Sequence, residues 1–449
     1  FEFIHSNTPG TLLATDRSLI RSRCMQGKNK REGSRRSTRE KRRKALEASQ
    51  KGSRDLVTIV PVEVERPLPN LSGLMSFANA LDARAHSMLN EAFAHTMVNH
   101  SLSSLDICAN FESLDRSSFH WLFQDGAFLH SVLCARFALH DLKGRTVADR
   151  RGIQPSRTTR YHFRETLLSL AKKLDRDDAY KDEVVVYVVL TLTIFAALFD
   201  DWDAVAKHIA GLKKIVVLRG GWSFLQTRPA LHFKLDRLDL AWSLSSGKAL
   251  FFLPHTMSWD PMLCRPATFL ASMYDPPAIW DHRLVVVFRD FQYLVFAINE
   301  SICKHARYQA SCFQNMINSL QTRLMYLSSQ LSNSTAELIR LSLLAFLATT
   351  LKVPGRKMPF PWITDQLRKA YTSAAMPGSP LKGDIKLHLW VIFVAAISVF
   401  DTNEPWLLEA WSPSWQEWHN IKQQLMRVMW IETIHDKLGE RVFEYLRAH

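Results

Sequence analysis

Cysteine is scarce in this 449-residue sequence, and its six cysteines form no recognisable site. No two of them stand as a C-x-x-C pair, the spacing expected of a thiolate zinc cluster. A disulfide-stabilised secreted domain carries cysteine at a far higher density. The sequence therefore predicts reduced thiols in a nucleus or cytoplasm and no cysteine-based metal site. The six residues are Cys24, Cys108, Cys134, Cys264, Cys303 and Cys312.

Long hydrophobic runs are also missing. The two longest, residues 184–199 and 387–400, are both bounded by charged residues. Both are shorter than the roughly 20 apolar residues that a helix needs to cross a bilayer. No signal peptide is visible at the start of the chain. We therefore expect two buried helices and no membrane association.

Catalytic and nucleotide-binding motifs are not found either. The sequence contains no G-x-S-x-G elbow, no G-x-G-x-x-G fingerprint and no phosphate-binding glycine loop. His95 and His100, or His435 beside Asp436, lack the H-E-x-x-H spacing of a zinc helix. His208 fits a core histidine better than a metal ligand. The sequence predicts no enzyme and no cofactor.

An acidic corner at Asp200, Asp201 and Asp203 leaves one enzymatic alternative open. Acid-rich corners on helical folds bind Mg²⁺ and a diphosphate when further carboxylates face the same cavity. No second acidic cluster follows on a later helix. The corner is therefore expected to end one helix and cap the next.

An aromatic cluster lies near the end of the chain. With Phe360 and Trp362 it has the composition of a small-molecule or peptide pocket. Tryptophans at such spacing more often fill a core or an interface, and we favour that interpretation. The cluster consists of Trp406, Trp411, Trp415 and Trp418.

Charge is concentrated near one end of the chain. Of a formal net charge of +14, residues 17–54 hold +12, from fifteen Lys and Arg against three Glu. The remaining residues therefore sum to +2. A stretch so rich in like charges and so poor in apolar residues cannot form a core. We expect a disordered basic arm and linker over residues 1–70, followed by one domain over residues 71–449.

The clustered Lys and Arg residues of the basic arm predict a nuclear-import signal or a contact with nucleic acid. Cations neutralise phosphates without reading bases, so DNA contact through the arm is expected to be non-specific. A solubilising tail is the simpler alternative. The residues assigned to import or nucleic-acid contact are Lys28, Lys30, Arg31, Arg35, Arg36, Arg39, Lys41, Arg42, Arg43 and Lys44.

Hydrophobic residues recur at three- and four-residue steps from residue 71 onward, which predicts an all-α domain of many helices. The clearest stretch is 184–222, where an apolar run, the acidic corner and a second periodic segment end at Gly220 and Gly221. Glycine there predicts a helix end, because it takes the left-handed conformation without steric cost. Predicted helices cover residues 72–100, 117–142, 157–174, 183–199, 203–219, 229–246, 282–304, 310–330, 335–351, 361–374, 384–400 and 414–446.

Several stretches, taken in order, resemble the fungal-specific transcription factor domain family. Residues 208–221, HIAGLKKIVVLRGG, are similar to that family's H-x-x-G-L-x-x-I-V-x-L-R-G-G signature, and residues 231–242 look like the helix after it. LWVIFVAAISVF at 389–400, WIETIHD at 430–436 and the start of the chain are similar as well. The resemblance covers most of the chain, and the R-G-G signature is its most specific part.

The resemblance implies a nuclear regulator of transcription in a filamentous fungus, with a helical body that binds regulators or other subunits. That family's DNA reader needs six cysteines in two groups, and Cys24 is the only cysteine near the basic arm. Either the reader lies upstream of Phe1, or the protein acts through partners. A helical interaction scaffold without a role at promoters is the alternative function, and a helical diphosphate-binding enzyme is a third. Arg219 of the signature is expected to have a structural role.

Overall fold

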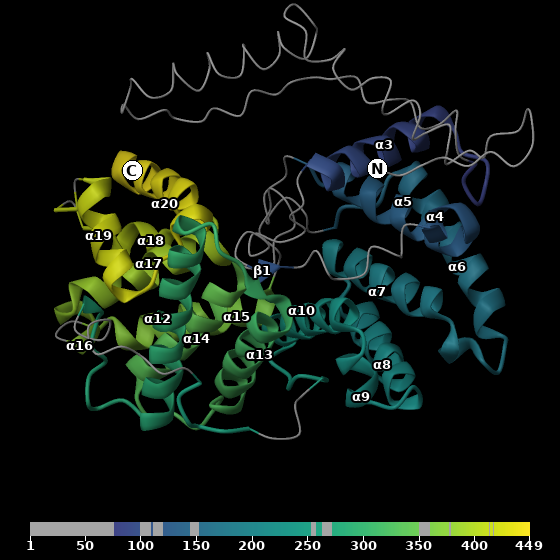
Figure 1. Ribbon diagram of the computed structural model, residues 1–449. Coiled ribbons are helices and arrows are strands. Elements are labelled where there is room, and N and C mark those ends of the chain that lie inside the picture. Colours follow the sequence, from purple (N-terminus) through teal and green to yellow (C-terminus); the bar gives the residue numbers. More distant parts are fainter. Residues whose placement is uncertain are drawn as a thin grey trace, which may run out of the picture. The chain divides into compact units, whose positions relative to one another are not determined.

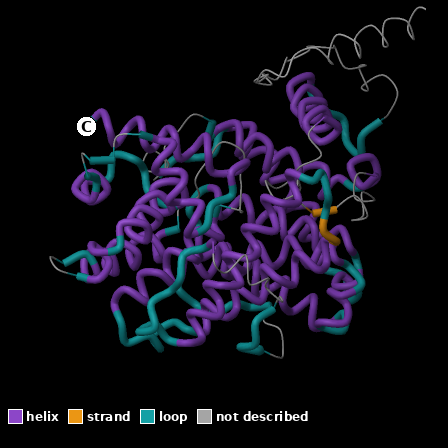
Figure 2. The backbone as a smooth tube through the Cα atoms, turned by 60° about the vertical axis from the view of Figure 1, so that its left-hand side comes forward, coloured by secondary structure: helices purple, strands orange, loops and turns teal. Residues whose placement is uncertain are grey.

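The computed structural model describes residues 76–98, 109–110, 120–143, 152–252, 257–262, 272–349, 360–376, 379–412, 414–415 and 417–449. The chain divides into Phe1–Pro67 and Leu68–His449, and all the described residues belong to the second unit. Helices make up nearly all of their regular structure (Figures 1 and 2), which confirms the all-α prediction. The basic arm and its boundary at residue 70 lie outside the described residues.

The described part contains seventeen α-helices, a short 3-10 helix and two very short strands. The strands β1 (Ala109–Asn110) and β2 (Tyr308–Gln309) pair in parallel. The 3-10 helix η6 covers Ala179–Lys181. The α-helices are α3 (Ala83–Val98), α4 (Trp121–Gln124), α5 (Gly126–Asp141), α6 (Arg157–Leu174), α7 (Glu183–Leu198), α8 (Trp202–Leu218), α9 (Trp222–Gln226), α10 (Pro229–Ser246), α12 (His282–Cys303), α13 (Ala310–Tyr326), α14 (Ser334–Ala348), α15 (Pro361–Ala374), α16 (Pro380–Gly383), α17 (Ile385–Ser398), α18 (Pro405–Ala410), α19 (Trp418–Val428) and α20 (Glu432–Ala448).

Two predicted helices are each divided in the structure. Within the helix predicted over 117–142, the described residues form α4 and α5, because the Asp125 carboxylate accepts the Phe128 backbone N–H at 3.0 Å and starts a new helix there. In place of one helix over 414–446, the structure has α19 from Trp418 and then α20, because Met429 takes an extended conformation with φ −174°. The helix predicted over 72–100 begins only at Ala83.

Helix α7 is buried on most sides, as its apolar sequence predicts. Twelve of its sixteen residues are buried. Thr193 is among them, and its hydroxyl donates to the Val189 carbonyl oxygen at 2.7 Å. Because the Thr193 hydroxyl is buried, it cannot bond to solvent, and this hydrogen bond to the backbone of its own helix satisfies it. Among the described residues, no helix combines the length and the apolar character required to span a membrane.

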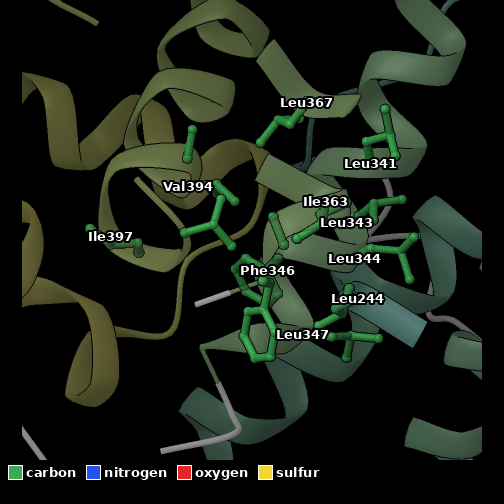
Figure 3. Close-up of a cluster of buried hydrophobic side chains, with 14 of the residues drawn as sticks. Leu244, Leu341, Leu343, Leu344, Phe346, Leu347, Ile363, Leu367, Val394 and Ile397 are labelled. Carbon is green, nitrogen blue, oxygen red and sulfur yellow. The ribbon is translucent and has the colours of Figure 1, made fainter. Parts of the chain in front are cut away.

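The buried side chains form two hydrophobic clusters. The smaller one joins α3, α5, α7 and α8, and the larger one is built mainly by α12, α13, α14, α15 and α17. Figure 3 shows part of the larger cluster, where leucines of α14 meet Ile363 and Leu367 of α15 and Val394 of α17. Helix α10 contributes to both clusters, and it therefore connects them.

Candidate functional site

The ten basic residues assigned to nuclear import or nucleic-acid contact, from Lys28 to Lys44, lie outside the described residues. Their role stays a prediction. The other candidates of the sequence lie mostly in the described part, and their contacts can be followed residue by residue.

The acidic corner between α7 and α8 is a helix-capping structure. The Asp201 carboxylate accepts the Ala204 backbone N–H at 3.0 Å, and Asp203 lies in the first turn of α8. Asp200 adopts a positive φ of 62° and accepts a hydrogen bond from the Trp202 indole. Negative charge at a helix N-terminus is stabilised by the helix dipole. The capping interpretation of these acids is confirmed.

Helix α8 ends at the two glycines of the R-G-G sequence, which take left-handed backbone conformations. Gly220 and Gly221 have φ values of 106° and 64°, and the Gly221 N–H donates to the Val216 carbonyl oxygen at 2.8 Å. Arg219 packs over the Phe224 ring at 4.3 Å and lies 3.8 Å from the Glu183 carboxylate of α7. The structural role expected of Arg219 is confirmed.

The tryptophans near the end of the chain pack against the larger cluster. The Trp406 ring centroid lies 4.6 Å from that of Tyr371, and the Trp411 and Trp415 centroids are 5.2 Å apart. Phe360 is a buried member of the same cluster and contacts Trp202 of α8. Trp362 and Trp418 also pack against this cluster, so the interpretation of the six aromatic residues as packing residues is confirmed.

The candidate histidines have packing roles where they are described. His435 is fully buried, with its Nε2 atom 2.9 Å from the Thr349 hydroxyl and its Nδ1 accepting the Ile431 N–H at 3.2 Å. His208 is half-buried rather than fully buried. The side chain of His95 and the whole of His100 lie outside the described residues.

A buried polar seam between α10 and α13 is not predicted by the sequence motifs. The Asp236 carboxylate accepts hydrogen bonds from Gln314 Nε2 at 2.7 Å and from Asn318 Nδ2 at 2.8 Å. His232 Nε2 lies 3.3 Å from the same carboxylate oxygen. One turn further along α10, Asp239 accepts the backbone N–H groups of Phe251 and Phe252, each at 2.7 Å. The seam fixes α10 against α13 and against the segment that follows α10.

Burial changes the protonation of this seam. It raises the pKa of Asp236 to about 8, although the amide donors of Asn318 and Gln314 oppose the shift. It also raises the pKa of Asp239 to about 7, against its two backbone donors. Burial lowers the pKa of His232. Burial therefore disfavours the charged form of both His232 and Asp236, although their side chains are in contact.

A second buried polar contact joins α5 to α6. The Nδ1 atoms of His130 and His162 lie 2.9 Å apart, and Asn79 Nδ2 lies 3.0 Å from His130 Nε2. An amide nitrogen can only donate, so His130 accepts at Nε2 and donates from Nδ1 to His162. Burial lowers the pKa of both histidines, and with the charge of His130 it brings that of His162 to about 4.

These buried polar contacts hold helices together. In the part of the chain that the structure describes, no group of three or more His, Cys, Asp and Glu side chains is arranged to hold a metal ion. A comparison of the chain with protein-family models, with curated proteins and with solved structures finds no match.

Proposed function

We propose that this protein is a regulator of transcription in a filamentous fungus, delivered to the nucleus by its basic arm and acting through the helical body. The observation that carries the proposal is the HIAGLKKIVVLRGG stretch at residues 208–221, together with the similar stretches that follow it in order. Catalysis is not part of the proposed role.

Two features of the chain support this proposal. Residues 17–54 carry twelve of the fourteen net positive charges. Such a concentration of positive charge is needed for recognition by the import machinery or for binding to phosphates. The signature residues of α8 have structural roles, since Arg219 pairs with Glu183 and the glycines end the helix. Regulation is therefore assigned to other surfaces of the body, where protein partners bind.

The test follows a fluorescently tagged full chain in a filamentous fungus. Deletion of residues 17–54 is expected to abolish nuclear accumulation and chromatin association. A second variant, with the ten assigned Lys and Arg replaced by Gln, is expected to behave in the same way. Deletion of residues 1–16 removes a stretch of similar position with almost no basic charge, and it serves as the control. Undiminished nuclear accumulation in the first two variants contradicts the role of the arm.

A further variant in the same fungus distinguishes a transcription regulator from an interaction scaffold. An unrelated import signal is attached to the protein that lacks residues 17–54. If the body regulates transcription through partners, chromatin association returns with nuclear entry. If the protein enters the nucleus and stays away from chromatin both with and without its arm, the scaffold alternative is correct and the proposal is wrong.

A further inference from the structure

Helix α6 buries its less apolar side. Its buried residues are Thr159, His162, Thr166 and Leu170, and three of these four are polar. The helix also carries four of the twelve large apolar side chains that are exposed in the described part of the chain. At about 100° of rotation per residue, Tyr161 and Leu168 lie opposite the buried residues, and Leu167 and Leu174 lie at the flank. Leaving leucines in water while burying threonine and histidine is unfavourable for an isolated domain. The exposed four, with their exposed fractions, are Tyr161 (54%), Leu167 (40%), Leu168 (47%) and Leu174 (50%).

Hydrogen bonds hold α6 in this orientation. The Thr159 hydroxyl donates to the Asp141 carboxylate at 2.6 Å, and His162 contacts His130 at 2.9 Å. Rotation of α6 about its axis to bury its leucines would break both contacts and leave Asp141 and His130 without these partners. For His130, which is buried, the loss of its partner costs about 1–3 kcal/mol. The exposed leucines are therefore a fixed feature of the surface.

Cations alternate with the exposed leucines. Arg160, Arg164 and Lys172 are all exposed, and Arg164 projects between Leu167 and Leu168 at about 100° of rotation per residue. The helix contains a single acid, Glu165, which is half-buried and opposes the lowering of the His130 pKa by burial. The Leu–Arg face, defined as Arg160, Tyr161, Arg164, Leu167, Leu168 and Lys172, is thus both apolar and positively charged.

We propose that the Leu–Arg face is a docking surface for an acidic amphipathic helix of a partner protein. Leucines or aromatic residues of that helix cover Tyr161, Leu167 and Leu168 and remove their apolar area from water. Its glutamates or aspartates, three and four residues apart, lie along Arg160, Arg164 and Lys172. The partner needs both properties, because the cations and the leucines share one face.

The distribution of charge favours this occupant over two others. If α6 paired with α6 of a second copy in antiparallel orientation about residue 166, Arg160 would lie opposite Lys172, and like charges would repel. A helix that lies in a membrane surface keeps its cations on the polar side of the apolar face. Arg164 lies between two leucines, where insertion would carry its charge into the apolar layer.

This inference deepens the partner-binding role proposed above and rests on it for biological meaning. Its test is independent, because it measures peptide binding by the helical body, whereas the proposed function is tested by nuclear accumulation and chromatin association. Either one can fail while the other holds.

The probe is a synthetic 18-residue helical peptide with leucines along one face and glutamates beside them. A second peptide has lysine in place of every glutamate, and a third has the first composition in scrambled order. Binding to the full-length protein is measured by fluorescence anisotropy at physiological salt. The glutamate peptide is expected to bind at least tenfold more tightly than either of the other two.

Variants on α6 connect binding to the Leu–Arg face. R160E/R164E is expected to weaken binding of the glutamate peptide at least tenfold and to strengthen that of the lysine peptide at least tenfold. Leu167→Ser with Leu168→Ser is expected to weaken both. Matched controls elsewhere are Arg441→Glu and Ile279→Ser, which replace an exposed cation and an exposed apolar residue. They are expected to change affinity by less than twofold.

Three results overturn the proposal. The first is equal affinity of the wild type and the α6 variants for the glutamate peptide, which assigns the binding to the basic arm. The second is a dimer of the wild type in analytical ultracentrifugation that is absent in the Leu167→Ser, Leu168→Ser variant, while the peptides bind both proteins equally. The Leu–Arg face then binds a second copy of the chain. The third is flotation of the wild-type protein with phosphatidylserine vesicles that is lost in the same leucine variant, while the peptides bind both proteins equally. The Leu–Arg face then binds a membrane surface.

Discussion

The contact between His130 and His162 predicts a loss of stability at mildly acidic pH that can be assigned to one side chain. His162 is only 4% exposed, and burial together with the charge of His130 lowers its pKa from 6.5 to about 4. The geometry explains why a proton is not tolerated. A proton added at Nδ1 of His162 would face the proton that His130 donates, and one added at Nε2 of His130 would face the Asn79 amide.

The sign of the effect follows from linkage. The unfolded chain binds the proton near pH 6.5, whereas the folded protein resists it until about pH 4. The stabilising contribution is therefore complete above pH 6.5 and is lost as the pH falls from 6.5 to 4. A shift of about 2.5 units at about 1.4 kcal/mol per unit corresponds to about 3 kcal/mol. Asp82 opposes the lowering of the His162 pKa, and that opposition is already contained in the value of about 4.

The experiment replaces His162 by Asn, which keeps a polar group close to the Nδ1 position and cannot take up a proton in this range. Free energies of unfolding in urea are measured for the wild type and the variant at several values between pH 7.5 and pH 4.5. At pH 7.5 the variant is expected to be less stable, because it loses the ring stacked on Phe137. That difference is expected to shrink by about 2–3 kcal/mol by pH 4.5.

A control and a clear negative result complete this test. His140→Asn changes an exposed histidine on α5, and its pH dependence is expected to follow the wild type. If the difference between the wild type and H162N is the same at pH 7.5 and pH 4.5, the reasoning about His162 is wrong.

Three further predictions concern stability, each measured as the urea midpoint and the free energy of unfolding. Asp201→Ala removes the cap of α8 and is expected to cost about 0.5–2 kcal/mol; an unchanged midpoint would contradict the capping role. Gly439→Ala places a Cβ atom 2.6 Å from the Trp418 ring and is expected to cost about 1–3 kcal/mol, whereas Gly211→Ala on the exposed side of α8 meets nothing within 4 Å and is expected to stabilise by about 1 kcal/mol; equal effects of the two would contradict the packing argument. Arg323→Met leaves the Asp290 carboxylate buried without the guanidinium that now contacts it at 2.9 Å and is expected to cost about 3–5 kcal/mol, with recovery when Asp290 is replaced by Leu as well; a double variant no more stable than R323M would contradict it.

Local signals in the sequence predict several helices closely. Helix α6 begins after Ser156, whose hydroxyl accepts the Thr159 N–H at 3.3 Å, and α15 begins at Pro361, a residue favoured in the first helical turn. Both helices have the predicted bounds. The breaks at Asp125 and Met429 are harder to predict. Gly126 follows Asp125 but is itself the first residue of α5, and neither glycine nor proline stands next to Met429. At Asp125 a carboxylate competes with the helix for a backbone N–H, and a sequence pattern does not show which of the two prevails.

Contacts between helices are less accessible from the sequence. His232, Asp236 and Asp239 stand four and three residues apart, so their common face on α10 is visible in the sequence. Their burial is not, because it depends on Gln314 of α13, which lies 78 residues from Asp236 in the chain. The apolar residues of α6 favour an inward-facing leucine side, and the contacts of His162 and Thr159 overrule that preference.

The position of α10 has a consequence for synthesis and folding. Leu231 and Leu235 complete the smaller cluster, while Trp242 and Leu244 of the same helix belong to the larger one. A nascent chain that ends before Pro229 therefore lacks part of the core that α5, α7 and α8 need, although those helices have already been made. Chains that stall or are cut at this point expose leucines and valines of α7. Quality control by chaperones and proteases is expected to act on the first half of the body until α10 has emerged from the ribosome.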